Sequence, residues 1–274
     1  MSFELHTIMA TKSPCYKEAR PMTPIGIVVH STGANNPELR RYVQPDDGNI
    51  GVNKYANAVN REDWRVIAHA YIGKDKNGVV KCYQVLPFDI ACWSAGKAAN
   101  GSYNYNPQGH IQFEICEDGL TDATYFNAAF DCAAEFCAYL CKEYNLSVDS
   151  ICSHKEAHAR GYASNHEDPE NWLVKFGKTM DWFRDKVNGL IKKETKEPDN
   201  VIYRVQVGAF SNRKFAENLL TELKYDGYNA FIVEEDIEPA PQPKTFKKGD
   251  RVVVSVNAKE TTGAVDKKYI IPIA

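Results

Sequence analysis

The chain has 274 residues, of which 43% are hydrophobic and 25% are charged, and its formal net charge is -3. This length allows one large domain and a smaller one, and the near-neutral charge argues against a protein that coats nucleic acid. No stretch approaches the roughly 20 consecutive apolar residues of a membrane-spanning helix. The N-terminal run MSFELHTIMATKSPCYKEAR lacks the apolar core of a signal peptide. We therefore expect synthesis in the cytoplasm without a signal peptide, and no insertion into a membrane.

The eight cysteines do not follow the pattern of a secreted disulfide scaffold, and no C-x-x-C pair for a thiolate zinc site occurs among them. Cys132, Cys137 and Cys141 share helical spacing with Phe130 and Leu140. This pattern indicates that they are small hydrophobic side chains of a core.

The first long part of the chain alternates predicted strands and helices. Residues 25–32, IGIVVHST, predict a buried strand that carries His30 near its end. Residues 68–73 and 79–86 flank the turn KDKNG and predict a hairpin. Residues 110–117, HIQFEICE, predict a strand with Gln112 and Glu114 on its polar face. That face could meet bulk water or line a cleft, and alternation alone does not decide between the two.

Two amphipathic helices are predicted by apolar side chains at helical spacing, over residues 122–144 and 171–192. Together with the strands they indicate a mixed α/β fold, in which helices flank a central mixed β-sheet. The charged run KKETKEPDN, residues 192–200, predicts a linker.

Beyond the linker, residues 203–210, 212–228 and 229–235 predict a strand, a helix and a strand, which is one βαβ unit within 201–238. Residues 239–274 contain the spacer PAPQP and a further predicted strand in KTFKKGDRVVVSV.

Three of the seven histidines lie in the run SHKEAHARGYASNHEDPENW, residues 153–172. A catalytic zinc ion typically has three protein ligands of the His, Cys or carboxylate type and one open position for water. Five side chains are candidate ligands for such an ion: His30, His154, His158, His166 and Asp168.

The spacing of His154 and His158 is that of a zinc-protease helix. That helix needs Glu directly after the first His, and Lys155 stands there. The inverted form needs Glu directly before the second His, and Ala157 stands there. The sequence therefore argues against a zinc-protease motif.

The segments IVVHST, AHAYI, ACWSAG, NPQGHIQFEICE and SHKEAHARGYASNHEDPENW occur in the order seen in zinc-dependent N-acetylmuramoyl-L-alanine amidases of the type-2 family. The chain resembles that family over roughly residues 25–182. The family shares its fold with T7 lysozyme and the peptidoglycan recognition proteins. The resemblance implies that the chain is a hydrolase of the amide between N-acetylmuramic acid and the L-alanine of the peptidoglycan stem peptide.

Carried over residue by residue, the resemblance implies that Zn²⁺ is held by His30, His154 and Asp168. It implies that Glu114 is the general base and that His166 stabilises the developing negative charge. Three weaker candidates for substrate contact follow from the same resemblance: His69, Trp93 and Asn106. Ser94 departs from the pattern, because many relatives have His directly after this Trp.

Residues 203–233 resemble the SPOR repeat, which binds glycan strands in wall amidases and their regulators. The usual domain contains two βαβ halves, whereas this chain shows one clear half, and about 35 residues rarely fold unaided. Two chains could each donate one half to a homodimer, or residues after Lys244 could complete the sheet. TFKKGDRVVVSV could instead begin a small SH3-like wall-binding module.

We therefore expect a modular peptidoglycan hydrolase with a zinc amidase domain over 1–191, a linker over 192–200, a SPOR-like unit over 201–238 and a partial β-rich module over 239–274. This layout resembles a phage or prophage endolysin that acts on the cell wall of a Gram-positive host after release. A cytoplasmic recycling amidase would need no wall anchor. The alternatives are a non-catalytic wall-recognition protein on the same fold and a cysteine peptidase that uses Cys152 or Cys116.

Overall fold

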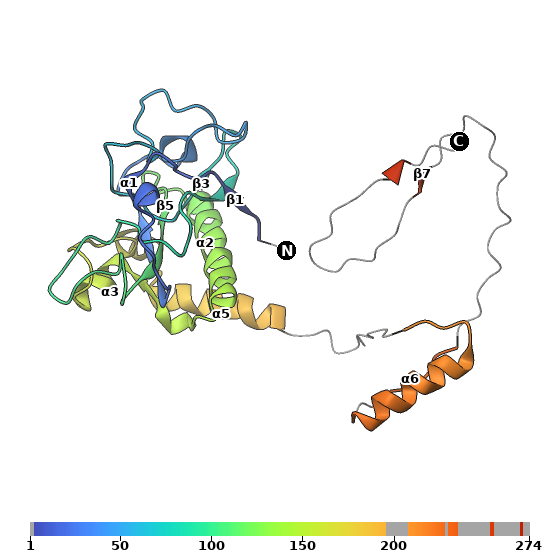
Figure 1. Ribbon diagram of the computed structural model, residues 1–274. Coiled ribbons are helices and arrows are strands. Elements are labelled where there is room, and N and C mark those ends of the chain that lie inside the picture. The colour runs from blue at the N-terminus through green and yellow to red at the C-terminus, as the bar shows by residue number, and fades with distance from the viewer. Residues whose placement is uncertain (1–2, 196–207, 228–229, 235–252, 255–268, 271–274) are drawn as a thin grey trace. The chain divides into compact units, whose positions relative to one another are not determined.

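The computed structural model describes residues 3–195, 208–227, 230–234, 253–254 and 269–270. The chain divides into two compact units, Met1–Val201 and Ile202–Ala274, and the first contains a six-stranded sheet and five α-helices (Figure 1). In the described part of the chain, no helix combines the length and apolar composition needed to span a bilayer.

The sheet is mixed, in the order β1-β4-β3-β5-β2-β6. Neighbouring strands run parallel except in the hairpin of β3 and β4, which confirms the predicted hairpin. The predicted strand over 25–32 is confirmed as β2, and every residue of β2 is buried. The strands are β1 (Leu5–Thr7), β2 (Gly26–Ser31), β3 (Ala70–Lys74), β4 (Val80–Gln84), β5 (His110–Ile115) and β6 (Ile151–Ser153).

One face of the sheet is apolar and is covered by α2 (Ala123–Glu143), which confirms the long predicted helix. The Asp122 side chain caps α2 by accepting hydrogen bonds from the N–H groups of Thr124 and Tyr125. Phe136 of α2 lies edge-on to Phe113 of β5, with 5.2 Å between ring centroids. The helix α5 (Met180–Thr195) joins the same core, in which Phe183 is completely buried.

The opposite face carries the polar side chains of β2 and β5. Two smaller apolar clusters lie on it, one around Tyr71 of β3 and one around Val28 of β2. Because β5 runs between β3 and β2, Gln112 and Glu114 stand between the clusters. The polar side of β5 is therefore flanked by apolar side chains, with Gln112 buried and Glu114 half-buried. The short elements near this face are α1 (Pro14–Glu18), the 3₁₀ turn η1 (Leu39–Arg41) and α3 (His154–Ala159).

The prediction of a single helix over 171–192 is wrong. The chain forms α4 (Glu170–Leu173), the 3₁₀ turn η3 (Val174–Phe176) and then α5, and a further 3₁₀ turn, η2 (Val148–Ser150), precedes β6. Gly177 adopts φ +64°, the left-handed conformation that ends helices, and the N–H of Lys178 donates to Leu173 O at 3.0 Å. Thr179 Oγ1 then accepts from the N–H of Trp182 and starts α5.

In the second unit the predicted helix is confirmed as α6 (Arg213–Tyr225), which Asn212 caps by accepting from the N–H of Lys214. Most of the predicted strand over 203–210 lies outside the described residues, and residues 208–210 and 230–234 form no strand. Two short strands, β7 (Val253–Val254) and β8 (Tyr269–Ile270), pair antiparallel. The helix α5 continues to Thr195, into the segment predicted as a linker.

Candidate metal centre and active site

Three candidate residues lie at the carboxyl ends of adjacent strands. His30 and Glu114 are in-register neighbours near the ends of β2 and β5, and His154 directly follows β6. Ligands of open α/β sheets bind at the carboxyl ends of the strands, where loops and side chains converge. The strand order therefore brings together residues that are far apart in the sequence.

His154 is held in place by a capping box at the start of α3. Ser153 Oγ accepts from the N–H of Glu156 at 2.9 Å, and Glu156 Oε2 accepts from the N–H of Ser153 at 3.1 Å. Arg184 of α5 donates to both carboxylate oxygens of Glu156, at 2.9 and 3.0 Å. The first residue of α3 is thus fixed to both the sheet and α5.

Asp168 reaches the same point from the loop before α4. Its main-chain carbonyl accepts from the N–H of His154 at 3.0 Å, and its Oδ2 accepts from the N–H of Ser31 at 3.3 Å. These two bonds tie the loop to β6 and to β2. The carboxylate keeps only a small exposed fraction, 12% of the side chain.

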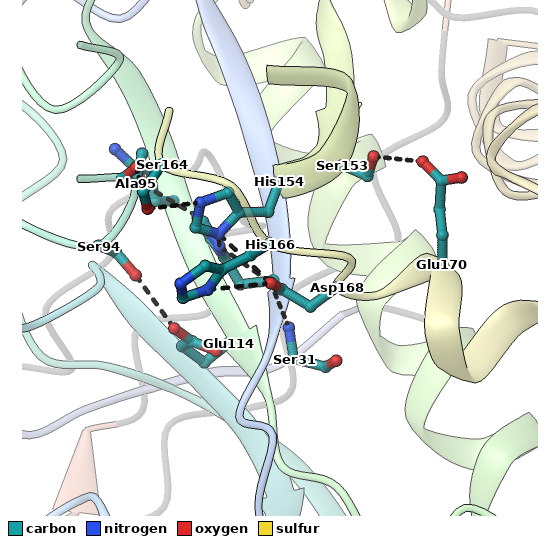
Figure 2. Close-up of polar contacts among 12 residues, drawn as sticks. Ser31, Ser94, Ala95, Glu114, Ser153, His154, Ser164, His166, Asp168 and Glu170 are labelled. Carbon is teal, nitrogen blue, oxygen red and sulfur yellow. Dashed lines mark hydrogen bonds and ion pairs between the residues drawn. The ribbon is translucent and has the colours of Figure 1, made fainter. Parts of the chain in front are cut away.

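The side chains of His30, His154 and Asp168 converge, as Figure 2 shows for His154 and Asp168. His30 Nδ1 lies 2.9 Å from His154 Nδ1 and 3.2 Å from Asp168 Oδ2, and His154 Nδ1 lies 3.4 Å from Asp168 Oδ1. Among the described residues, these three are the one group of His, Cys, Asp and Glu side chains close enough to hold a metal ion together. The three sequence-predicted ligands are therefore brought together.

The hydrogen bonds of the two imidazoles fit a bound cation. His30 Nε2 faces Gln112 Oε1 at 3.0 Å, and His154 Nε2 faces Ser164 Oγ at 3.2 Å. Ser164 Oγ can donate to Ala95 O at 3.2 Å while it accepts from His154. Protons on both Nε2 atoms leave two Nδ1 lone pairs and a carboxylate facing one another, which is the donor set of a zinc site.

The charges of the three side chains are strongly coupled. Burial alone would raise the pKa of Asp168, but hydrogen bonds with His154 and His30 bring it below the usual range. Burial lowers the pKa of His154. For His30, burial acts to lower the pKa, but the hydrogen bond with Asp168 and the nearby carboxylates outweigh it, so the pKa is raised. An anionic carboxylate beside two imidazoles attracts a cation.

Glu114 is suited to proton transfer. Its Oε1 accepts from Ser94 Oγ at 3.0 Å, whereas its buried Oε2 has no hydrogen-bond partner within the described ranges. Burial raises the pKa of Glu114 to about 7, against the opposing influence of His30. A carboxyl group with a pKa near neutrality can both accept and return a proton.

His166 lies at the exposed edge of the site. Its ring stacks on that of His154, with 4.6 Å between centroids, and its Nδ1 is 3.6 Å from Asp168 Oδ1 (Figure 2). Its side chain is 61% exposed. His166 can therefore reach a bound substrate, which the buried rings of His30 and His154 cannot.

Two of the weaker predictions need correction. His69 is fully buried, and both ring nitrogens bond to the main chain: Nε2 to Ile90 O at 2.9 Å and Nδ1 to the N–H of Gln112 at 3.0 Å. It has no polar atom left for a substrate. Asn106 accepts from the N–H of Thr23, ahead of β2, and so lies at the end of the sheet opposite the site.

Trp93 is placed more favourably for its predicted role. It is partly exposed and directly precedes Ser94, the residue that contacts Glu114. Its main chain pairs with Ile67 through two hydrogen bonds of 3.1 Å. The Trp93 side chain packs against the apolar cluster around Tyr71, and its role in substrate contact stays a prediction.

The structure also bears on the remaining alternatives. His158 Nδ1 bonds to Ala163 O at 3.0 Å and is not one of the converging ligands. Cys116 and Cys152 are buried, and burial raises the pKa of the Cys152 thiol to about 12 and that of Cys116 well above its ordinary value. A nucleophilic cysteine needs an accessible thiolate, so neither thiol fits that role.

Two residues of the site escaped the sequence reasoning, Asn104 and Ser164. Gln112 was predicted to share the polar face of the strand with Glu114, but no role followed from that position. Asn104 and Ser164 lie in loops, where no periodicity indicates which residues face the sheet.

Two parts of the chain match known protein families. The sequence profile described as N-acetylmuramoyl-L-alanine amidase matches residues 20–171, and that of the SPOR domain matches residues 177–259. No curated protein sequence matches the chain.

Solved structures resemble this chain at low sequence identity. The Staphylococcus aureus hydrolase AmiA, in complex with its ligand, is 17% identical, with a TM-score of 0.51 over 71% of this chain and 86% of its own. PlyL is 21% identical, with a TM-score of 0.47 over 68% of this chain and 97% of its own. A mutant endolysin from Bacillus subtilis is 24% identical, with a TM-score of 0.45 over 67% and 98%. Because the amidase profile matches more than half of the chain, the chain belongs to the N-acetylmuramoyl-L-alanine amidase family, and it carries a SPOR domain in its C-terminal region.

Proposed function

We propose that the protein is a zinc-dependent peptidoglycan hydrolase that cleaves the amide between N-acetylmuramic acid and the L-alanine of the stem peptide. The observation that carries the proposal is the convergence of His30, His154 and Asp168 near a Glu114 oxygen that has no partner among the described residues. Membership of the amidase family supports the choice of bond.

When bound, zinc would lower the pKa of a water molecule to about 7 and polarise the amide carbonyl. Ser94 engages Glu114 Oε1, so Oε2 is the atom that remains to accept a proton from the attacking water. Glu114 then returns that proton to the amide nitrogen as the carbon–nitrogen bond breaks. The same carboxyl group thereby acts first as base and then as acid.

His166 has a different task in this proposal. As the water adds, the carbonyl oxygen of the substrate becomes negative, and a hydrogen-bond donor placed there stabilises the transition state. The exposed imidazole of His166, stacked on His154, is positioned to donate to that oxygen.

The SPOR domain would hold the enzyme on glycan strands. Within the part of the chain that the structure describes, α6 has no buried side chain, and Phe215 is 59% exposed. A helix face on which apolar side chains gather and stay uncovered marks a site of association with another protein. We include in the proposal that two chains pair through this region to form a dimeric wall-binding unit.

A catalytic domain joined to a wall-binding domain suits an enzyme that degrades the cell wall after it leaves the cytoplasm. We therefore also propose a role as a phage or prophage endolysin, made in the cytoplasm and acting on the wall of a Gram-positive host after release.

Glu114→Gln should reduce the rate of wall hydrolysis by about 10²- to 10⁴-fold, because the amide cannot accept the water proton. Zinc content should stay unchanged, since Glu114 is not among the converging ligands. The rate is followed through new L-alanine amino termini, and the metal through elemental analysis. Glu62→Gln, at an exposed residue paired with Lys17, is the matched control. Full activity in Glu114→Gln would mean that another group is the base.

Chelation should abolish the release of L-alanine amino termini from purified cell wall, and added zinc should restore it. The ligand set offers two neutral imidazoles and one carboxylate, so the metal should leave reversibly. If the zinc-loaded protein binds cell wall but releases no amino termini, the fold serves recognition and the proposed hydrolysis is wrong.

Light scattering at micromolar concentration should report twice the mass of one chain. Phe215→Asp should yield the single-chain mass, because a charge on the exposed face of α6 opposes apolar pairing. A monomer in the unsubstituted protein would refute the dimeric unit and leave the amidase proposal intact.

The purified protein, added to intact Gram-positive cells, should clear a suspension of them, whereas Glu114→Gln should not. Turbidity provides the measurement. Hydrolysis of purified wall without lysis of any such cells would contradict the endolysin role.

A further inference from the structure

Asn104 and Gln112 are completely buried polar side chains behind His30, and neither is a candidate ligand or base. Asn104 Oδ1 accepts three hydrogen bonds of 3.0 Å, from the N–H of Ser94, the N–H of Ala95 and Gln112 Nε2. Its Nδ2 donates to Gly96 O at 2.8 Å. We call the chain of contacts from Ser94 and Ala95 through Asn104 and Gln112 to His30 the amide relay.

Main-chain atoms fix the direction of the amide relay. A side-chain amide can reverse its oxygen and nitrogen ends, but a main-chain N–H only donates and a carbonyl only accepts. The N–H groups of Ser94 and Ala95 therefore require Asn104 Oδ1 to face them, and Gly96 O requires the nitrogen end. Asn104 has one permitted orientation.

The orientation of Asn104 determines that of Gln112, and Gln112 in turn contacts His30. Because Asn104 presents an oxygen, Gln112 must present its Nε2 to Asn104 and its Oε1 to His30. An oxygen acceptor 3.0 Å from His30 Nε2 favours a proton on that nitrogen, in competition with the Asp168 carboxylate 3.2 Å from Nδ1. The lone pair of neutral His30 is then on Nδ1, the atom that faces His154 and Asp168.

The loop of Ser94, Ala95 and Gly96 also supports the rest of the site. Ser94 Oγ donates to Glu114, and Ala95 O accepts from the N–H of Ser164 at 2.8 Å. Ser164 is the residue whose hydroxyl faces His154. A Cβ atom on Gly96, at φ +66°, would lie 2.6 Å from Ser164 Oγ, so the loop packs closely against Ser164.

We propose that Asn104 is a positioning residue that sets the metal-binding tautomer of His30 through Gln112 and fixes the loop that holds Glu114 and Ser164. The inference deepens the proposed function, because an Nδ1 lone pair on His30 is required by a metal ion. According to this proposal, the N–H groups of Ser94 and Ala95 determine which nitrogen of His30 carries the proton, although two side chains lie between them and His30.

The direct test is nitrogen NMR of the imidazoles in the metal-free protein. The spectra are recorded at alkaline pH so that the imidazole rings are neutral. Unsubstituted protein should show His30 with its proton on Nε2. In Asn104→Ala, Gln112 is free to reverse, and His30 should shift towards the Nδ1-protonated form. Zinc affinity, from competition with a chromophoric chelator, should fall by about 10- to 100-fold.

A conservative variant should reverse the effect. Asn104→Asp keeps an oxygen acceptor towards the N–H groups of Ser94 and Ala95 and towards Gln112 Nε2, although it loses the donor to Gly96 O. The Nε2-protonated form of His30 should therefore return. A role of Asn104 in packing alone would leave the His30 tautomer unchanged in Asn104→Ala.

Gln112→Met provides a second variant, because it cuts the relay and leaves the bonds of Asn104 to the loop in place. It should lose the Nε2 preference of His30, and it decides the question if Asn104→Ala does not fold. Gln84→Met and Asn53→Ala are matched controls, since both amides bond to carbonyl groups remote from His30.

The proposal is overturned if His30 keeps its proton on Nε2 and zinc affinity is unchanged in both Asn104→Ala and Gln112→Met. The tautomer is read without metal, so the result holds even if the protein proves inactive. Failure of the unsubstituted protein to bind zinc would refute the proposed function and would not affect the tautomer measurement.

Discussion

The convergence of three hydrogen-bond acceptors is the constraint on which the rest of the structure depends. Two imidazole nitrogens and a carboxylate repel one another unless a proton or a cation lies among them, so the fold must hold them together at a cost. The rigid ends of β2 and β6 position the two histidines. Asp168 is held by main-chain bonds to both neighbours, one from the N–H of Ser31 and one between its own carbonyl and His154. Stability lost at this point is recovered in the apolar core on the far side of the sheet.

The two faces of the sheet have different roles: one provides the stability of the domain, and the other carries the site. The face under α2 is packed with aromatic and aliphatic side chains, and the other face carries Gln112 and Glu114 between two small apolar clusters. Those clusters flank the reacting groups, and Tyr71 of one cluster is the in-register neighbour of Glu114 on β3. The resulting low dielectric strengthens each polar contact and raises the pKa of Glu114. The polar face of β5 can thus take part in proton transfer because apolar side chains flank it on both sides.

The sequence predicted much of this arrangement, but unevenly. The apolar run before His30 and the alternation around Glu114 are local patterns, and the strands followed them. The convergence of His154 and Asp168 could be predicted only from the resemblance to a family, because periodicity carries no information about which loops lie close together. The resemblance also suggested substrate roles for His69 and Asn106 that burial and strand direction contradict. Gly177 adopts the left-handed conformation and divides the predicted helix into two. The sequence did not reveal this break, because the apolar spacing continues in phase on both sides of Gly177.

The thiols of the chain have a consequence for where the enzyme can work. All eight cysteines are free, and seven of them are buried. Oxidants and other thiols attack the exposed thiolate form, which burial and a raised pKa both suppress. A fold whose sulfur atoms are sheltered in this way can leave a reducing compartment for an oxidising one without acquiring crosslinks or sulfenic acids, and so would tolerate both environments unchanged.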